Sequence, residues 1–164
     1  MTIAEALLAE FEQQAPVTRR FLERLPEGKL GWQPHPKSMT AGQLALHLAT
    51  VPGGAVRSAG QDPSPLPDFI FPAPASVAAI LGAFDDSNAT VRELLPKFSD
   101  ASMNESWRLV AADGRELRAM PRMAFVRNIM LNHWYQHRGQ FSVYLRLLGV
   151  AVPSSWGPSA DEPI

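Results

Sequence analysis

The segment from about Pro121 to Leu148 is predicted to form one long helix, and it places the strongest constraint on the fold. Proline is favoured in the first turn of a helix, and a glycine after the segment is a typical helix stop. His133 and His137 lie four residues apart, so their rings share one helix face about one turn apart. At 100° per residue that face is otherwise largely apolar, since it also carries Val126, Met130, Gln140, Tyr144 and Leu148. The two imidazoles therefore interrupt an apolar stripe instead of facing water.

The opposite face of this helix is predicted to be polar, because it carries Asn128, Arg138, Ser142 and Arg146. Leu131 and Tyr135 are the apolar or aromatic residues on that otherwise polar side. They indicate a surface for a partner.

Burying two ring nitrogens costs free energy unless a partner satisfies them, and either a metal ion or hydrogen bonds would do so. A third histidine, His47, lies in a helix that is apolar nearly all round. Two interpretations follow from the spacing: core histidines satisfied by hydrogen bonds, or a three-histidine site for a divalent metal. In the second, Gln43 or Thr50 is a candidate to orient the His47 ring. His35, between two prolines, is predicted to be an ordinary surface residue.

Two further helices begin with a capping-box pattern, in which a Thr is followed three residues later by Glu or Gln. The first is expected over residues 2–25 and the second from Thr40. Pro52-Gly53-Gly54 is expected to bend or break the second helix one turn after His47. A third helix is expected over residues 76–98. Residues 104–120 are predicted to form a small hairpin around Asp113-Gly114.

Residues 57–75 contain five prolines and little periodicity, and a connection this long is unusual inside a compact domain. It is predicted to be either a crossover between the ends of a helical bundle or a lid over a site. The tail, residues 152–159, is expected to be irregular and to fold back. Together these elements predict an all-α fold, a four-helix bundle with a long crossover loop and a small hairpin before the last helix. Residues 1–164 are expected to form one domain.

The composition excludes several classes of site and partner. Because the chain has no cysteine, disulfides, thiolate metal sites and a cysteine nucleophile are all excluded. A net charge of −1 gives no excess of positive charge that would attract nucleic acid or an anionic membrane. No apolar run approaches the ~20 residues of a membrane span, and the N-terminus does not resemble a secretory signal. A soluble, cytoplasmic protein is expected.

Other chemistries have little support in the sequence. Trp134 follows His133, so the general-base glutamate of the zinc-peptidase motif is absent. The carboxylates Asp85-Asp86 and Glu10 and Glu12 are expected on solvated helix faces. No serine–histidine–aspartate set or glycine-rich phosphate loop is evident, and no side chain identifies itself as a general base. The catalytic residues, if any, are therefore unassigned.

Two elements of the sequence together resemble the DinB-like (DinB/YfiT) superfamily over almost the whole chain. The first runs from Leu30-Gly31-Trp32-Gln33-Pro34 to His47, and the second is His133…His137-Arg138-Gly139-Gln140 followed by Leu145-Arg146, Gly149 and Pro153. The resemblance implies a four-helix bundle with up-down-down-up topology, and frequently a homodimer. It also implies a nickel or zinc site whose ligands fall on His47, His133 and His137.

Some relatives in that superfamily are S-transferases or isomerases that use mycothiol, bacillithiol or a similar thiol. The expected function is therefore that of a divalent-metal-binding protein, with thiol S-transfer as the expected activity. The thiol and the electrophile would both be small molecules, because the chain has no cysteine. Three alternatives stay open: a non-catalytic metal- or ligand-binding bundle, a metal-hydroxide hydrolase, and a metal-free domain whose histidines merely pack.

Overall fold

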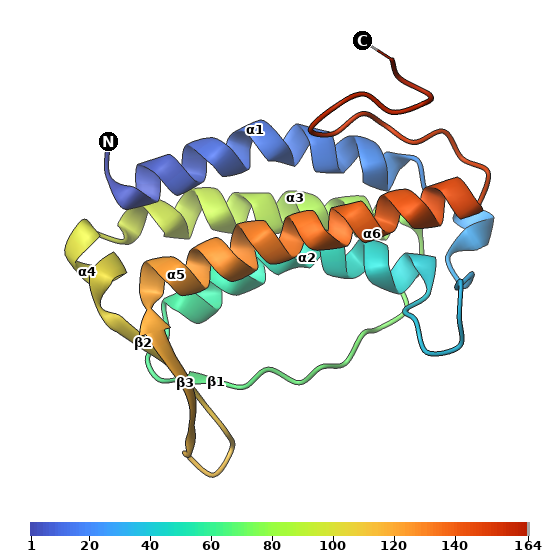
Figure 1. Ribbon diagram of the computed structural model, residues 1–164. Helices are drawn as coiled ribbons and strands as arrows, with labels where there is room; N and C mark the ends of the chain where they lie inside the picture. The colour runs from blue at the N-terminus through green and yellow to red at the C-terminus, as the bar shows by residue number, and fades with distance from the viewer. Residues whose placement is uncertain (164) are drawn as a thin grey trace.

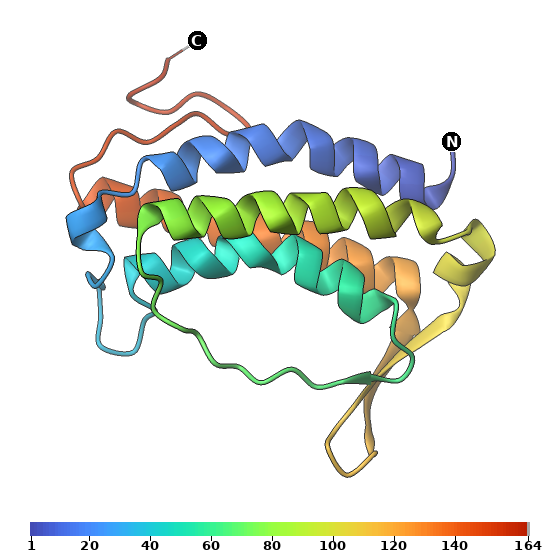
Figure 2. The same ribbon diagram turned by 180° about the vertical axis from the view of Figure 1, so that it is seen from behind.

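A computed structural model describes residues 1–163. Its long helices run side by side (Figures 1 and 2), and they are α1 (Ile3–Glu23), α2 (Ala41–Ala59), α3 (Val77–Leu94) and a continuous helix formed by α5 (Arg122–Val126), the π-helical segment η3 (Arg127–His133) and α6 (Trp134–Leu147). The shorter helical elements are η1 (Glu27–Lys29), η2 (Leu95–Lys97) and α4 (Asp100–Asn104). Within this part of the chain, no helix combines the length and apolar character needed to cross a membrane.

The predicted helix starts are confirmed by their capping contacts. The Thr2 hydroxyl accepts from the Glu5 backbone N–H at 3.2 Å, and the Glu5 carboxylate accepts from the Thr2 N–H at 2.7 Å. Thr40 and Gln43 make the same reciprocal pair at the start of α2. Each box satisfies N–H groups that the first helical turn leaves unpaired. Just after the end of the long last helix, Gly149 adopts φ +71°, the left-handed conformation that glycine tolerates best.

The prediction of an all-α fold made of a four-helix bundle is wrong. The described residues include a three-stranded mixed sheet, formed by β1 (Ser64–Pro65), β2 (Ser106–Val110) and β3 (Glu116–Pro121) in that order, and the additional short helix α4. The β2–β3 hairpin is the one predicted over residues 104–120. The parallel strand β1 comes from the proline-rich segment, where two paired residues are too short to leave an alternating pattern in the sequence.

Helix α2 does not break at Pro52 but continues to Ala59. In an α-helix the Leu48 carbonyl would accept from the backbone N–H of residue 52. Because proline has no backbone N–H, this carbonyl is left without its usual donor. The indole N–H of Trp134 donates to that carbonyl at 2.9 Å instead. A side chain from the last helix therefore supplies the hydrogen bond that Pro52 cannot supply.

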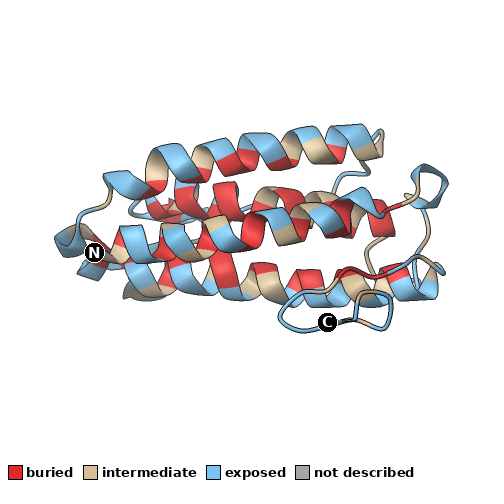
Figure 3. Ribbon diagram, turned by 90° about the horizontal axis from the view of Figure 1, so that it is seen from above, coloured by how far each residue is buried: buried red, intermediate tan, exposed pale blue. Residues whose placement is uncertain are grey.

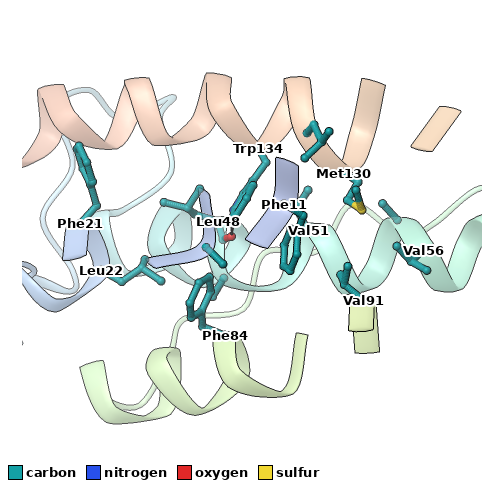
Figure 4. Close-up of a cluster of buried hydrophobic side chains, with 14 of the residues drawn as sticks. Phe11, Phe21, Leu22, Leu48, Val51, Val56, Phe84, Val91, Met130 and Trp134 are labelled. Carbon is teal, nitrogen blue, oxygen red and sulfur yellow. Dashed lines mark hydrogen bonds between the residues drawn. The ribbon is translucent and has the colours of Figure 1, made fainter. Parts of the chain in front are cut away.

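The core lies where the inner faces of the long helices meet (Figure 3). Phe11 of α1 stacks on Trp134 with ring centroids 5.3 Å apart, and both side chains are fully buried. Figure 4 shows these two rings next to Leu48 of α2. The aromatic centre of the core is thus in direct contact with the helix that carries His47.

Helices α2 and α3 pack closely together at Gly53, where the Gly53 N–H donates to the Ser87 hydroxyl at 2.9 Å. A Cβ at Gly53 would lie 2.9–3.0 Å from the Ser87 Oγ, Cα and carbonyl oxygen, whereas one at Gly54 would meet nothing within 4 Å. Gly53→Ala is expected to lower the free energy of unfolding by about 1–3 kcal/mol through overpacking. Gly54→Ala, the matched control, is expected to raise it by about 0.4–1 kcal/mol. Urea unfolding measures both, and equal effects at the two positions would contradict the close approach.

Candidate metal centre

The structure brings His47, His133 and His137 together. His47 lies on α2, His133 ends the π-helical segment η3, and His137 lies one turn later on α6. The Nε2 atom of His47 is 3.2 Å from that of His133 and 3.1 Å from that of His137, and the last two are 2.9 Å apart. These nitrogens form a cluster that could hold a metal ion. His35 is exposed and lies outside the cluster, as predicted.

The π-helical segment changes which side chains of the last helix are buried. A π-helix pairs each N–H with the carbonyl five residues back, so counting at 100° per residue fails across it. Leu131, expected on a polar face open to a partner, is fully buried, and Arg138 is 2% exposed. Tyr135 is half-buried and donates its hydroxyl to Glu10 of α1 at 3.0 Å. The predicted partner surface at Leu131 and Tyr135 is therefore wrong, because α1 packs against that side.

All three histidines are held in the neutral form that binds metals. Burial lowers the pKa of His47 to about 4, helped by the neighbouring charges of His137 and His133. Burial, with the charge of His137, lowers the pKa of His133. Burial also lowers the pKa of His137, partly opposed by its hydrogen bond to Gln140. At neutral pH each ring therefore offers a lone pair without first losing a proton.

Gln140 fixes the orientation and tautomer of His137. Its amide oxygen lies 2.6 Å from Nδ1 of His137 and accepts the ring N–H, so the Nε2 lone pair points into the cluster. Such a partner for the second ring nitrogen is typical of metal-ligating histidines. Gln43 and Thr50, the residues predicted to orient the His47 ring, make other hydrogen bonds. Gln43 donates to the Phe71 carbonyl, and the Thr50 hydroxyl donates to the Leu46 carbonyl.

Protons alone cannot satisfy the three nitrogens, whereas a cation can. Each neutral Nε2 is either a donor or an acceptor, so in any tautomer at least one of the three contacts joins two like groups. Two nitrogens that each lie about 2.1 Å from the same metal ion are about 3.0 Å apart when the N–metal–N angle is 90°, and about 3.4 Å apart when that angle is tetrahedral. The observed 2.9–3.2 Å separations match the right-angled arrangement. Three such nitrogens leave further positions on the ion open, as in catalytic sites.

The proline-rich connection forms one wall of the cluster. The Phe71 ring meets His47 edge to face, with centroids 5.3 Å apart. Gln43 holds this part of the connection by donating to the Phe71 carbonyl at 2.7 Å. Figures 1 and 2 show the connection passing along α2 between the sheet and α3. The segment thus carries the chain from β1 to α3, as a crossover would, and also shields one side of His47.

Carboxylates take no part in the cluster within residues 1–163. Glu10 pairs with Arg127 at 2.6 Å, Glu12 with Arg92 at 2.7 Å, and Asp85 with Arg19 at 2.5 Å. These acidic groups lie on helix surfaces, as predicted, where ion pairs occupy them. The candidate centre therefore consists of imidazoles only, and it presents no acidic general base.

The role of Gln140 leads to a second prediction. Gln140→Leu removes the acceptor for His137 Nδ1–H and is expected to weaken zinc or nickel binding about 10–100-fold. Gln140→Glu keeps an acceptor oxygen and is expected to restore most of the affinity. Gln136→Leu, an exposed glutamine on the same helix, is the matched control. Competition with a chelator measures all three, and equal affinity in the two leucine variants would contradict the role.

A third prediction concerns pH in the metal-free protein. The folded state holds the pKa of His47 at about 4, below its ordinary value of 6.5, so between these values the unfolded state binds more protons. The stability that neutral His47 contributes is thus present above pH ~6.5 and lost as pH falls toward ~4. His47→Gln is expected to lose less stability than the parent protein between pH 7 and pH 5. Parallel losses in urea unfolding at the two pH values would contradict the shift.

The chain is similar to known proteins in both sequence and structure. The family model described as the DinB superfamily matches residues 10–141. The uncharacterized protein YrdA of Bacillus subtilis (strain 168) is 26% identical over 159 residues, which cover 94% of this chain and 89% of YrdA.

Solved structures show the same fold. A DinB-like protein from Bacillus cereus ATCC 10987 is similar with a TM-score of 0.73 and 23% identity, over 93% of this chain and 97% of that one. The DinB-like protein YjoA from Bacillus subtilis is similar with a TM-score of 0.66 and 16% identity, over 96% and 98%. Since the family model spans most of the sequence, the chain belongs to the DinB superfamily.

Proposed function

We propose that the protein binds one divalent metal ion, nickel or zinc, through His47, His133 and His137. The observation that carries the proposal is the mutual contact of three neutral Nε2 atoms at 2.9–3.2 Å. Imidazole nitrogens suit both metals. A structural zinc site would use four protein ligands, whereas this cluster provides three within the described residues.

We propose further that the protein is a thiol S-transferase that uses a low-molecular-weight thiol. A divalent ion in this centre would supply Lewis acidity that favours the thiolate of a bound thiol at neutral pH. In the transfer, the thiol sulfur bonds to an electrophilic carbon, the leaving group departs, and the thiol proton goes to solvent. His47, His133 and His137 would hold the ion, Gln140 would keep His137 in the ligating tautomer, and Phe71 would restrict water on one side.

The activity is tested with protein loaded with nickel or zinc. Low-molecular-weight thiols are offered with an electrophile such as an aryl halide, and the conjugate is measured by mass spectrometry. Turnover that needs both thiol and metal, and that is lost in His137→Ala, is the expected result. Thiol-independent hydrolysis of an ester would favour the metal-hydroxide hydrolase instead. Metal binding without turnover of either kind would favour the non-catalytic metal-binding protein.

We also propose a cytoplasmic homodimer in which residues 1–164 form one domain. The resemblance to the superfamily supports the dimer, and so do two exposed apolar residues on successive turns of α6. These are Val143, 55% exposed, and Leu147, 59% exposed. Light scattering on the parent protein is expected to give twice the chain mass, and Val143→Asp/Leu147→Asp is expected to give the single mass. A monomeric parent protein would contradict the dimer.

A further inference from the structure

Arg138 carries a buried positive charge that no carboxylate neutralises in the part of the chain that the structure describes. Its side chain is 2% exposed. Its Nη2 donates to the Gln14 Oε1 at 2.8 Å, and its Nη1 donates to the Thr18 hydroxyl at 3.2 Å and to the Gln14 carbonyl at 3.5 Å. All three acceptors are neutral. A buried charge with only neutral partners is costly, and an anion would offset that cost.

Acidic groups around this region of the fold are already occupied: Glu10, which accepts from the Tyr135 hydroxyl, pairs with Arg127. Glu162 of the C-terminal tail pairs with Arg20 and Arg24 of α1. Asp161 pairs with Arg146 at 2.6 Å and accepts from the Val152 N–H at 2.8 Å. Hence the tail lies against α1 and the last helix without supplying a carboxylate to Arg138.

The Arg138 guanidinium also has N–H groups that its contacts with Gln14 and Thr18 do not use. It carries five N–H groups in one plane, and three contacts to Gln14 and Thr18 use only Nη1 and Nη2. The Nε–H makes no hydrogen bond to any residue from 1 to 163. Nε–H and an adjacent Nη–H form the edge of arginine that binds two oxygens of a carboxylate at once.

A cavity of about 90 Å³ lies beside this guanidinium, between α1, α6 and the tail. It is lined by Phe21, Tyr135, Arg138, Gly139, Ser142, Ser155 and Trp156. The Arg138 guanidinium carbon lies 5.3 Å from the centre of the Tyr135 ring and 5.7 Å from that of Trp156. The walls thus combine one cation, two serines and three aromatic rings. None of His47, His133 and His137 lines this cavity.

We propose that this cavity is a binding site for a small carboxylate, separate from the histidine cluster. The two carboxylate oxygens accept from the free edge of Arg138, and the carbon end of the ligand packs against the aromatic walls. A cavity of about 90 Å³ accommodates a carboxylate of the size of formate or acetate. Phosphate, which has four oxygens and a higher charge, would need more donors than one arginine edge and two hydroxyls offer.

The test is a titration of ¹⁵N-labelled protein with sodium acetate, sodium formate and sodium phosphate at constant ionic strength, with sodium chloride as reference. The Arg138 Nε–H resonance is identified by its loss in Arg138→Lys. Acetate and formate are expected to shift this resonance and the Trp156 indole resonance saturably. No saturable shift with either carboxylate would overturn the proposal. Binding of phosphate about tenfold tighter than acetate would overturn the assignment to carboxylates.

Two variants of Ser142 test whether acetate binds in this cavity or elsewhere on the protein. Ser142→Leu fills the cavity and is expected to weaken acetate binding at least about tenfold. Ser142→Ala keeps the cavity open and is expected to bind acetate within about threefold of the parent protein, since one neutral hydrogen bond is worth little net. Equal binding by the leucine and alanine variants would place the anion elsewhere and overturn the site. The titration of the parent protein decides the question even if Ser142→Leu does not fold.

Discussion

Trp134→Ala is expected to lower the free energy of unfolding by about 3–5 kcal/mol through lost packing alone. The indole is fully buried and stacks on Phe11, so its removal leaves a cavity at the centre of the core. The variant also leaves the Leu48 carbonyl without a donor, which adds about 1–3 kcal/mol. Because domains of this size are stable by about 5–15 kcal/mol in total, Trp134→Ala is expected to be largely unfolded at moderate urea concentrations. An effect below about 2 kcal/mol would contradict the packing.

The hydrogen bond from Trp134 can be separated from its packing by a double-mutant cycle. Trp134→Phe removes the indole N–H but keeps an aromatic ring. Pro52→Ala restores a backbone N–H that can donate to the Leu48 carbonyl four residues earlier. Trp134→Phe is therefore expected to cost about 1 kcal/mol less in the Pro52→Ala background than in the parent protein. Equal costs in the two backgrounds would show that the indole does not replace the missing donor.

Metal binding is expected to stabilise the folded protein strongly, because a ligand that binds only the folded state adds to its stability. Zinc or nickel at 100 times its dissociation constant adds about 2.7 kcal/mol. For a chain of this length that corresponds to a rise in Tm of about 5–11 °C. Scanning calorimetry with and without metal measures the rise.

The histidine variants show whether the cluster is responsible for that rise. His133→Ala removes one of the three nitrogens in mutual contact, and it is expected to abolish most of the stabilisation. His35→Ala, at an exposed histidine outside the cluster, is the matched control and is expected to keep it. A rise in Tm that His133→Ala leaves intact would mean that the metal binds elsewhere.

The features predicted correctly from the sequence are those determined by short-range geometry. The capping boxes at Thr2 and Thr40 locate two helix starts because their contacts span three residues. Gly149 marks a helix end because of its own backbone conformation. The four-residue spacing of His133 and His137 places their Nε2 atoms in contact. One turn of helix separates such residues in any sequence.

The features missed depend on residues far apart in the chain. Pro52 was expected to bend or break its helix, but the helix continues, and the indole of Trp134, 82 positions later in the sequence, donates the hydrogen bond that Pro52 cannot donate. The burial of Arg138 and Leu131 depends on a π-helical segment and on α1. Gln140 shared the histidine face in the sequence, and its position three residues after His137 was the available signal for its role.

Metal content tests the central claim most directly. Untagged protein is purified without chelator, offered nickel and zinc, and analysed by mass spectrometry beside His47→Ala, His137→Ala and His35→Ala. We predict about one ion per chain in the parent protein and in His35→Ala, and close to none in the other two variants, since each removes one of three ligands. A parent protein that takes up neither metal would contradict the site. Undiminished metal content in His47→Ala and His137→Ala would do so equally.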